Sequence, residues 1–292
     1  MDSVVVNGVR LGYERAGSGP AVVLVGGTGM PPVAWQLCGL REALVQAGFE
    51  VVTYAARGVA PSDAPAAPYT VDDLAADLAG LIEALELGPS VVVGYSLGSF
   101  TAELLARTRP DLVRAAVLLA GAGPLTGVLD AVLEAETELI ATTGRLSPAF
   151  MRLQTLLSTL PPAVLRSDDA QVRTWLELLG AQEAVWTSTE GENGQSAASD
   201  RWLRDEHRMA ALGQITAPVL VLAYEHDLYF PPSCGQIAAD ALPRGQFTQI
   251  PGAAHGGLLT HPGETTKAIL AFLADLDLNQ PGQGTGASPG GA

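Results

Sequence analysis

Short apolar runs along the chain alternate with turn residues and with longer segments of helical periodicity. Five of these runs are apolar on both faces, a pattern that predicts strands covered on both sides of a sheet. They are Ala21–Val25, Glu50–Tyr54, Ser90–Gly94, Ala115–Leu119 and Pro218–Leu222. A weaker run, Phe247–Ile250, predicts a last strand.

A hairpin is expected before these strands, because Val4–Val6 and Val9–Tyr13 flank Asn7-Gly8, the residue pair that tight hairpin turns favour. Helical patterns separate the later strands. They cover approximately residues 34–48, 70–87, 98–109, 233–241 and 262–276. Strands that alternate with helices predict an α/β fold, here a mostly parallel, eight-stranded sheet with helices on both faces.

One long segment has no convincing buried strand. Residues 124–208 show helical pattern interrupted by glycine and proline, and Thr187–Asp200 within it is polar and rich in small residues. We interpret 124–208 as a helical cap inserted between strands of an α/β core, and Thr187–Asp200 as a flexible loop. The core is expected to consist of 1–123 and 209–278. The tail, 279–292, is expected to be disordered.

Composition narrows the class of protein. Hydrophobic residues make up 48% and charged residues 16%, which is typical of a globular chain. A formal net charge of −15 disfavours a nucleic-acid partner, because phosphate binding needs a positive surface. With neither a signal-peptide pattern nor an apolar run long enough for a bilayer, we expect a cytoplasmic protein without a membrane partner. Cys38 and Cys234 indicate packing rather than disulfides or a metal site.

Gly94-Tyr95-Ser96-Leu97-Gly98 fits the pattern G-x-S-x-G and lies between a predicted buried strand and a predicted helix. In that context the serine is a candidate nucleophile on a sharp strand-to-helix turn, where side chains in place of the glycines would collide. The simpler alternative is an ordinary glycine-rich turn. The flanking strand and helix favour the nucleophile.

A serine nucleophile needs a histidine base and an acid that orients the base. His255 follows the last predicted strand on a glycine-rich loop, and Asp227 follows the strand that ends at Leu222. His207, His226 and His261 are the other histidines, and Glu225 is a rival for the acid. The alternatives are that His255 is a surface-loop residue and that Asp227 only caps a turn.

Several motifs, taken together and in order, resemble the α/β-hydrolase superfamily over approximately residues 3–275. They are the Asn7-Gly8 hairpin, the glycine-rich loop after Val25, Arg57-Gly58 with Ser62, the Ser96 turn, Asp227 with Pro231, and His255. The resemblance implies a Ser-Asp-His triad. It also implies an oxyanion hole formed by the backbone N–H groups of Thr28 and Leu97.

The chain departs from the family pattern in three loops. Gly26-Gly27 stands where members usually have His-Gly, so the histidine that often braces this loop is missing and the loop is expected to be looser or wider. Ala55-Ala56 precedes Arg57-Gly58 where relatives carry an acid. Tyr224 stands where a glycine commonly follows the acid-bearing strand.

These features predict a serine hydrolase, free of metal and cofactor, that cleaves an ester, thioester or lactone of a hydrophobic small molecule through an acyl-enzyme. Candidate substrate-binding residues are Gly27, Met30, Tyr95, Trp175 and Trp186. The simpler alternative for the apolar cap residues is that they form the cap's own core. Four other functions use the same fold: acyl transfer or cyclisation in biosynthesis, C–C bond hydrolysis, cofactor-free perhydrolysis, and ligand binding with slow turnover.

Overall fold

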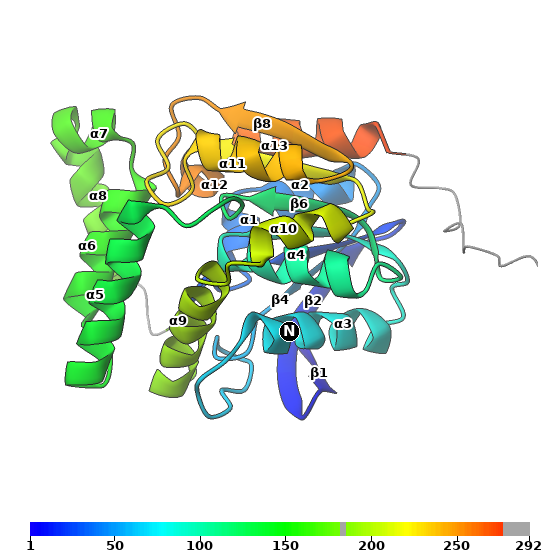
Figure 1. Cartoon of the computed structure of the whole chain (residues 1–292), viewed down its shortest axis with the longest axis horizontal. Helices are drawn as coiled ribbons and strands as arrows, with labels where there is room; N and C mark the ends of the chain where they lie inside the picture. The colour runs from blue at the N-terminus through cyan, green and yellow to red at the C-terminus, as the bar shows by residue number, and fades with distance from the viewer. Residues whose placement is uncertain (182–184, 277–292) are drawn as a thin grey trace, which may run out of the picture.

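A single twisted sheet runs through the protein (Figure 1). The structure, a computed structural model, describes residues 1–181 and 185–276. In this part of the chain the sheet has eight strands in the order β1-β2-β4-β3-β5-β6-β7-β8. β2 runs antiparallel to its two neighbours, β1 and β4, and the other neighbouring strands pair parallel. The predicted fold class is confirmed. The strands are β1 (Asp2–Val6), β2 (Val9–Gly17), β3 (Ala21–Val25), β4 (Glu50–Tyr54), β5 (Ser90–Tyr95), β6 (Val113–Leu119), β7 (Val219–Tyr224) and β8 (Gly245–Ile250).

The predicted hairpin joins β1 to β2, with Val6 opposite Val9. Asn7 and Gly8 form the turn with φ values of 50° and 77°. Two consecutive residues with positive φ match the right-handed twist of the flanking strands, and asparagine and glycine adopt this conformation at low cost. The Asn-Gly pair therefore sets the register of the first two strands.

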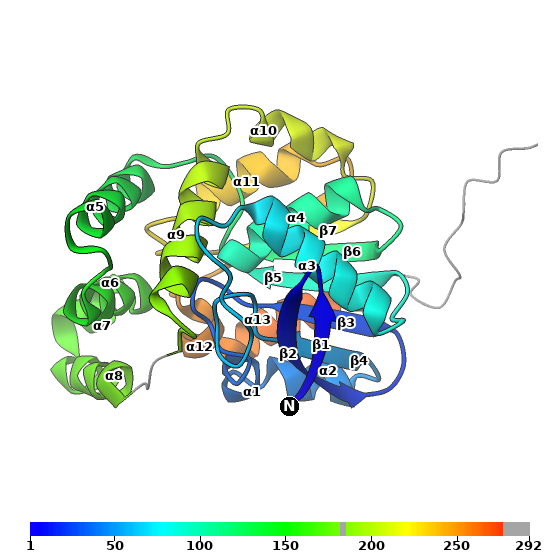
Figure 2. The same cartoon turned by 90° about the horizontal axis from the view of Figure 1, so that it is seen from below.

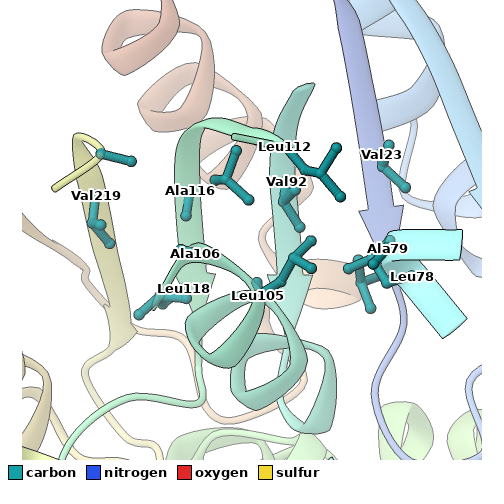
Figure 3. Packing of buried hydrophobic residues seen from close by; sticks show 14 of the residues in the cluster. Val23, Leu78, Ala79, Val92, Leu105, Ala106, Leu112, Ala116, Leu118 and Val219 are labelled. Carbon is teal, nitrogen blue, oxygen red and sulfur yellow. The ribbon is translucent and has the colours of Figure 1, made fainter. Parts of the chain in front are cut away.

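Helices cover both faces of the sheet, as the double-sided strand pattern requires. On β3, Val23 and Val25 belong to one buried cluster, while Val22 and Leu24 belong to another on the opposite face. Figure 3 shows the first cluster, where Leu105 of α4 packs near Val92 of β5. α3 (Val71–Ala84), α4 (Leu97–Thr108) and α11 (Pro232–Ala241) cover that face, and α1 (Ala34–Leu37), α2 (Leu40–Gln46) and α13 (Pro262–Ala274) cover the other.

The single helix predicted for 34–48 is wrong, because α1 and α2 are separate helices. Gly39 breaks the chain between them with φ of 74°, a left-handed conformation that suits glycine. Trp35 before the break and Leu40 and Leu44 after it are buried in the same cluster. The apolar pattern continues through the break for this reason, and periodicity does not reveal it.

The segment between β6 and β7 begins, in its described residues, with the helices α5 to α9. Figures 1 and 2 show α5 to α8 beside the sheet and α9 between them and the core. Their bounds are α5 (Gly127–Thr143), α6 (Pro148–Thr159), α7 (Pro162–Ser167), α8 (Asp169–Ala181) and α9 (Thr189–Leu203). Three short elements complete the described chain: α10 (Arg208–Ala211), a 3₁₀ turn (Leu212–Gln214) and α12 (Gly257–Thr260).

The flexible loop predicted at Thr187–Asp200 is wrong, because most of this segment forms α9. Two glycines of α9 lie against other segments of the chain, one against backbone and one against an aromatic ring. A Cβ on Gly191 would collide with Gly58, and a Cβ on Gly194 would collide with the ring of Tyr69. Small residues here permit close packing of a helix, whereas in the sequence they resemble a loop.

The predicted disordered tail, 279–292, lies outside the described residues. Within the described ranges, no helix is long and apolar enough to cross a membrane.

Candidate active site

The turn between β5 and α4 holds Ser96 in a strained conformation. Its φ of 52° and ψ of −117° are rare for a residue with a side chain. The flanking glycines are sterically required, because a Cβ on Gly94 would collide with the Gly98 backbone and a Cβ on Gly98 would collide with the Val25 carbonyl. The G-x-S-x-G segment thus forms the sharp strand-to-helix turn that its spacing predicts.

Three loops at the carboxyl edge of the parallel strands bring Ser96, His255 and Asp227 together. The Nε2 atom of His255 lies 3.2 Å from Oγ of Ser96, and its Nδ1 atom lies 2.8 Å from Oδ2 of Asp227. Asp227 is only 3% exposed. Its second oxygen, Oδ1, accepts hydrogen bonds from the backbone N–H groups of Tyr229 and Phe230 at 2.8 and 3.0 Å. Both carboxylate oxygens are therefore held in place.

Aromatic side chains surround the imidazole of His255. The ring centroids of Tyr229, Tyr95 and Phe230 lie 5.1, 5.5 and 6.1 Å from that of His255. The Tyr95 hydroxyl donates a 2.9 Å hydrogen bond to the carbonyl of His255. Burial raises the pKa of Tyr95 and of Tyr229, so both hydroxyls stay neutral. The histidine is thus fixed through its ring and its backbone.

The other candidates for the base and the acid do not contact Ser96 or His255 in the described chain. Glu225 accepts a 2.7 Å hydrogen bond from the backbone N–H of Gly252, and the nearest histidine nitrogen to it belongs to His226, at 4.0 Å. His207 is exposed at the start of α10. His261 is half-buried at the start of α13, with Nδ1 3.0 Å from Oγ1 of Thr260. None of the three histidines contacts Ser96 within the described chain.

The loop after β3 lies against the Ser96 turn. A Cβ on Gly27 would be 3.2 Å from Cβ of Ser96 and 3.1 Å from the ring of Tyr95. Leu97 is the first residue of α4, where helical N–H groups lack helical acceptors. In the described part of the chain, no protein group accepts a hydrogen bond from the amide of Thr28 or of Leu97. Both amides are available to a negatively charged oxygen.

The family model described as alpha/beta hydrolase fold matches residues 20–262. The chain belongs to this family. This α/β hydrolase is 33% identical over 270 residues to "Putative non-heme bromoperoxidase BpoC" of Mycobacterium tuberculosis, covering 92% of this chain and 99% of the relative. The crystal structure of that protein matches with a TM-score of 0.81 over 93% of this chain and 97% of the other.

Two further relatives bear different names. A "Putative carbamate hydrolase RutD" of Caulobacter segnis is 29% identical, over 90% of this chain and 94% of the relative. The enol-lactonase from Burkholderia xenovorans LB400 has a TM-score of 0.79 at 23% identity, over 94% of this chain and 100% of that one. At this low identity the second likeness shows the fold alone.

The inserted segment of this α/β hydrolase contacts two loops beside Ser96 and His255. In the histidine loop, a Cβ on Gly256, next to His255, would collide with Thr159 at the end of α6. In the loop after β3, a Cβ on Gly29 would lie 2.8 Å from the ring of Trp186. The inserted segment therefore contacts the histidine loop through α6 and the loop after β3 through Trp186, which lies between α8 and α9.

The predicted substrate-binding residues divide into two groups. Gly27, Tyr95 and Trp186 lie at the site, and the N–H of Met30 donates a 3.0 Å hydrogen bond to the Gly27 carbonyl in the same loop. Trp175 is not brought to the site. It lies on α8, which packs against α6 and α7 at the outer side of the inserted helices (Figure 2).

Sequence reasoning missed several residues at the site. Tyr229 and Phe230 contact His255, and their position two and three residues after Asp227 is the signal that could have revealed them. Thr159 and Gln195, from α6 and α9, carry no comparable signal. Gln195 lies 99 positions after Ser96 in a segment with loop-like composition.

The Arg57-Gly58 and Ser62 motif has a structural role in this α/β hydrolase. Arg57 donates two hydrogen bonds of 2.7 Å to the buried carboxylate of Asp77 on α3. The Ser62 hydroxyl donates to the Ala55 carbonyl at 2.6 Å and accepts from the Gly12 amide at 2.9 Å. These bonds hold the loop after β4 in place. Among the described residues, no group of three or more His, Cys, Asp or Glu side chains could hold a metal ion.

Proposed function

We propose that this α/β hydrolase is a serine hydrolase that cleaves a carboxylic ester, thioester or lactone through an acyl-enzyme. One observation supports the proposal above all others. His255 contacts Oγ of Ser96 through Nε2 at 3.2 Å, while its Nδ1 contacts the buried carboxylate of Asp227 at 2.8 Å. This arrangement activates a hydroxyl that is otherwise a poor nucleophile.

The reaction follows from these contacts. His255 takes the proton of Ser96 as Oγ attacks the substrate carbonyl, and Asp227 stabilises the imidazolium that forms. The amides of Thr28 and Leu97 stabilise the negative oxygen of the tetrahedral intermediate. His255 then protonates the leaving group, and a water molecule, activated in the same way, releases the acid and regenerates Ser96.

The decisive experiment is labelling and hydrolysis by wild type and Ser96→Ala. Wild type should react with a fluorophosphonate probe and hydrolyse members of an ester, thioester and lactone panel. Ser96→Ala should lose the label and several orders of magnitude in kcat. Ser18→Ala, a change at an exposed turn serine, is the matched control and should behave as wild type. Hydrolysis by Ser96→Ala at the wild-type rate contradicts the proposal, as does a wild type that takes the label but turns over nothing on the panel.

Substrates with apolar acyl groups are favoured in this proposal. Met30, Trp186, Tyr229 and Phe230 give the surroundings of Ser96 and His255 an apolar and aromatic character. In a series of p-nitrophenyl esters, kcat/KM should rise from acetate to medium chain lengths. A maximum at acetate contradicts this substrate class.

Perhydrolysis is the second candidate, supported by the 33% identity to a relative named as a non-heme bromoperoxidase. In that reaction hydrogen peroxide replaces water in attacking the acyl-enzyme and releases a peracid. The two candidates differ in the acyl acceptor, so one acyl donor is assayed with water alone and with added peroxide. Internal hydroxyl and amine acceptors in the same assay test acyl transfer and cyclisation.

A further inference from the structure

Gln195 joins two loops that lie beside the candidate active site. The residue is on α9 and is 0% exposed. Its Oε1 accepts a hydrogen bond from the backbone N–H of Gly29 at 2.9 Å, and its Nε2 donates to the Arg57 carbonyl at 2.9 Å. One side-chain amide thus links the loop after β3 to the loop after β4. Both of its polar atoms have partners, as a buried amide requires.

The loop after β3 has little internal means of holding its shape. Gly26, Gly27 and Gly29 are three of the four residues that follow β3, and Gly29 has φ of 65°. Glycine restricts the backbone least, so such a segment has several accessible conformations. Within the described chain, its internal backbone hydrogen bond runs from the Met30 N–H to the Gly27 carbonyl. An external restraint is therefore needed to select one conformation.

The partner loop provides a firm anchor. Arg57 is bound through two hydrogen bonds to Asp77, and both residues are buried. α9 itself is held close by the contacts of Gly191 with Gly58 and of Gly194 with the Tyr69 ring. Gln195 therefore transmits the position of a rigid part of the core to the glycine-rich loop.

Gly29 directly follows Thr28, the proposed donor of the oxyanion hole. The N–H of Gly29 belongs to the peptide plane that leaves Thr28, so fixing this group restricts ψ of Thr28. Trp186 packs against Gly29 and restricts the loop from another direction. The direction of the Thr28 N–H depends on both restraints.

We propose that Gln195 is a positioning residue for the oxyanion hole. It holds the Thr28 amide toward Ser96 by binding the neighbouring Gly29 amide, and it touches neither the substrate nor the triad. The inserted helix α9 thereby completes a catalytic element of the core. This inference rests on the proposed serine hydrolase function.

Gln195→Met tests the inference, because methionine has a similar volume and neither donates nor accepts a strong hydrogen bond. We expect kcat to fall about 10- to 100-fold with KM within about threefold, since the misplaced amide acts chiefly in the transition state. Affinity for a boronic acid transition-state analogue should fall in parallel, whereas affinity for a non-reactive substrate analogue should not. Gln195→Glu keeps an acceptor for the Gly29 amide and, in its protonated form, a donor for the Arg57 carbonyl, so it should retain more of kcat than Gln195→Met.

Two controls separate positioning from folding. Asn193→Ala removes an amide on the same helix that binds the Gly144 carbonyl at 3.1 Å, away from the loop, and should leave kcat unchanged. Hydrogen exchange should be faster in the peptide covering residues 26–31 of Gln195→Met, with exchange in α4 unchanged. Both controls are measured well below the melting temperature of each variant, so that folded proteins are compared.

Any of three results overturns the inference. Gln195→Met could keep the wild-type kcat and analogue affinity, or it could lose as much affinity for the substrate analogue as for the transition-state analogue. The third result is a loss of kcat in Asn193→Ala equal to that in Gln195→Met. In each of these cases the wild-type protein still reacts with the fluorophosphonate probe and hydrolyses its substrate. Failure of the proposed function appears differently, as a wild-type protein that hydrolyses nothing on the panel.

Discussion

The carboxylate of Asp227 orients His255 and is itself oriented by backbone. Oδ2 contacts Nδ1 of the histidine, and Oδ1 is occupied by the Tyr229 and Phe230 amides. In this arrangement Nδ1 carries the proton, and Nε2 is free to accept the proton of Ser96. Local geometry thus determines which tautomer faces the serine.

Asp227→Asn tests this role of the carboxylate. The amide has nearly the same shape but no charge, and its NH₂ group favours the opposite histidine tautomer. We expect kcat/KM for the preferred ester to fall by about four orders of magnitude with little loss of stability. Steady-state hydrolysis together with thermal unfolding measures both quantities.

Glu225→Gln is the matched control for this change. Glu225 lies two positions earlier and binds the Gly252 amide instead of His255, so its loss should change kcat/KM less than about fivefold. A loss in Glu225→Gln equal to that in Asp227→Asn would transfer the acidic role to Glu225.

At the scale of the element, α9 shows that a composition typical of loops can also form a closely packed helix. Its glycines and small polar residues predict a loop, yet they permit a helix to approach Gly58 and Tyr69 closely. α1 and α2 illustrate the opposite failure, where continuous apolar periodicity hides a break at Gly39. In both cases packing against distant residues, rather than local propensity, determines the element.

Gly194→Ala tests the docking of α9. The added Cβ would collide with the Tyr69 ring, so α9 must move or strain its contacts, and overpacking of this kind costs about 1–3 kcal/mol. We expect a lower free energy of unfolding in urea, together with reduced kcat because Gln195 moves with the helix.

Gly180→Ala provides the matched control on α8. Among the described residues outside its own helix, no atom lies within 4 Å of the added Cβ, and a helix is more stable with alanine than with glycine by about 0.5–1 kcal/mol. This variant should be as stable as wild type or more stable. Equal destabilisation in the two variants would mean that packing against Tyr69 is not the cause.

At the scale of the whole molecule, the buried side chains of Glu103 and Arg208 join the helix that follows Ser96 to the segment that leads back to the core. Glu103 of α4 lies 3.2 Å from Arg208 of α10, and both side chains are 2% exposed or less. Arg208 also donates a hydrogen bond to the Gly123 carbonyl. Burial raises the pKa of Glu103 to about 7, and the charges of Arg208 and Arg107 oppose this rise.

This raised pKa makes stability depend on pH. The folded protein retains the Glu103 proton up to a pH of about 7, whereas the unfolded chain loses it near 4.5. Between these values the folded state binds more protons, so the free energy of unfolding falls as pH rises, by at most about 1.4 kcal/mol per pH unit. Urea unfolding of wild type between pH 4.5 and 8 measures the slope.

Glu103→Gln should remove this contribution, because glutamine does not titrate and resembles the protonated carboxyl in shape and charge. The difference in unfolding free energy between wild type and Glu103→Gln should therefore decrease toward higher pH. Glu83→Gln alters an exposed ion pair with Arg109 and should keep the wild-type slope. A difference independent of pH in Glu103→Gln would contradict the assignment.

The sequence alone determined the core of this protein and the order of its chemistry. Double-sided apolar runs, the Asn7-Gly8 turn and the G-x-S-x-G spacing depend on local propensity and on which faces are buried, and both are encoded within a few residues. Ser96, Asp227 and His255 each follow the carboxyl end of a parallel strand (β5, β7 and β8), and this position predicts that the three meet at one edge of the sheet.

Only the tertiary structure decided which parts of the inserted segment reach the site. Trp175 and Trp186 are equivalent by residue type, yet only Trp186 packs against the loop after β3. Gln195 bonds to Gly29, 166 positions away, in a segment whose composition predicts a loop. Such contacts depend on where each helix docks, and docking is set by side-chain packing between distant segments rather than by any local pattern.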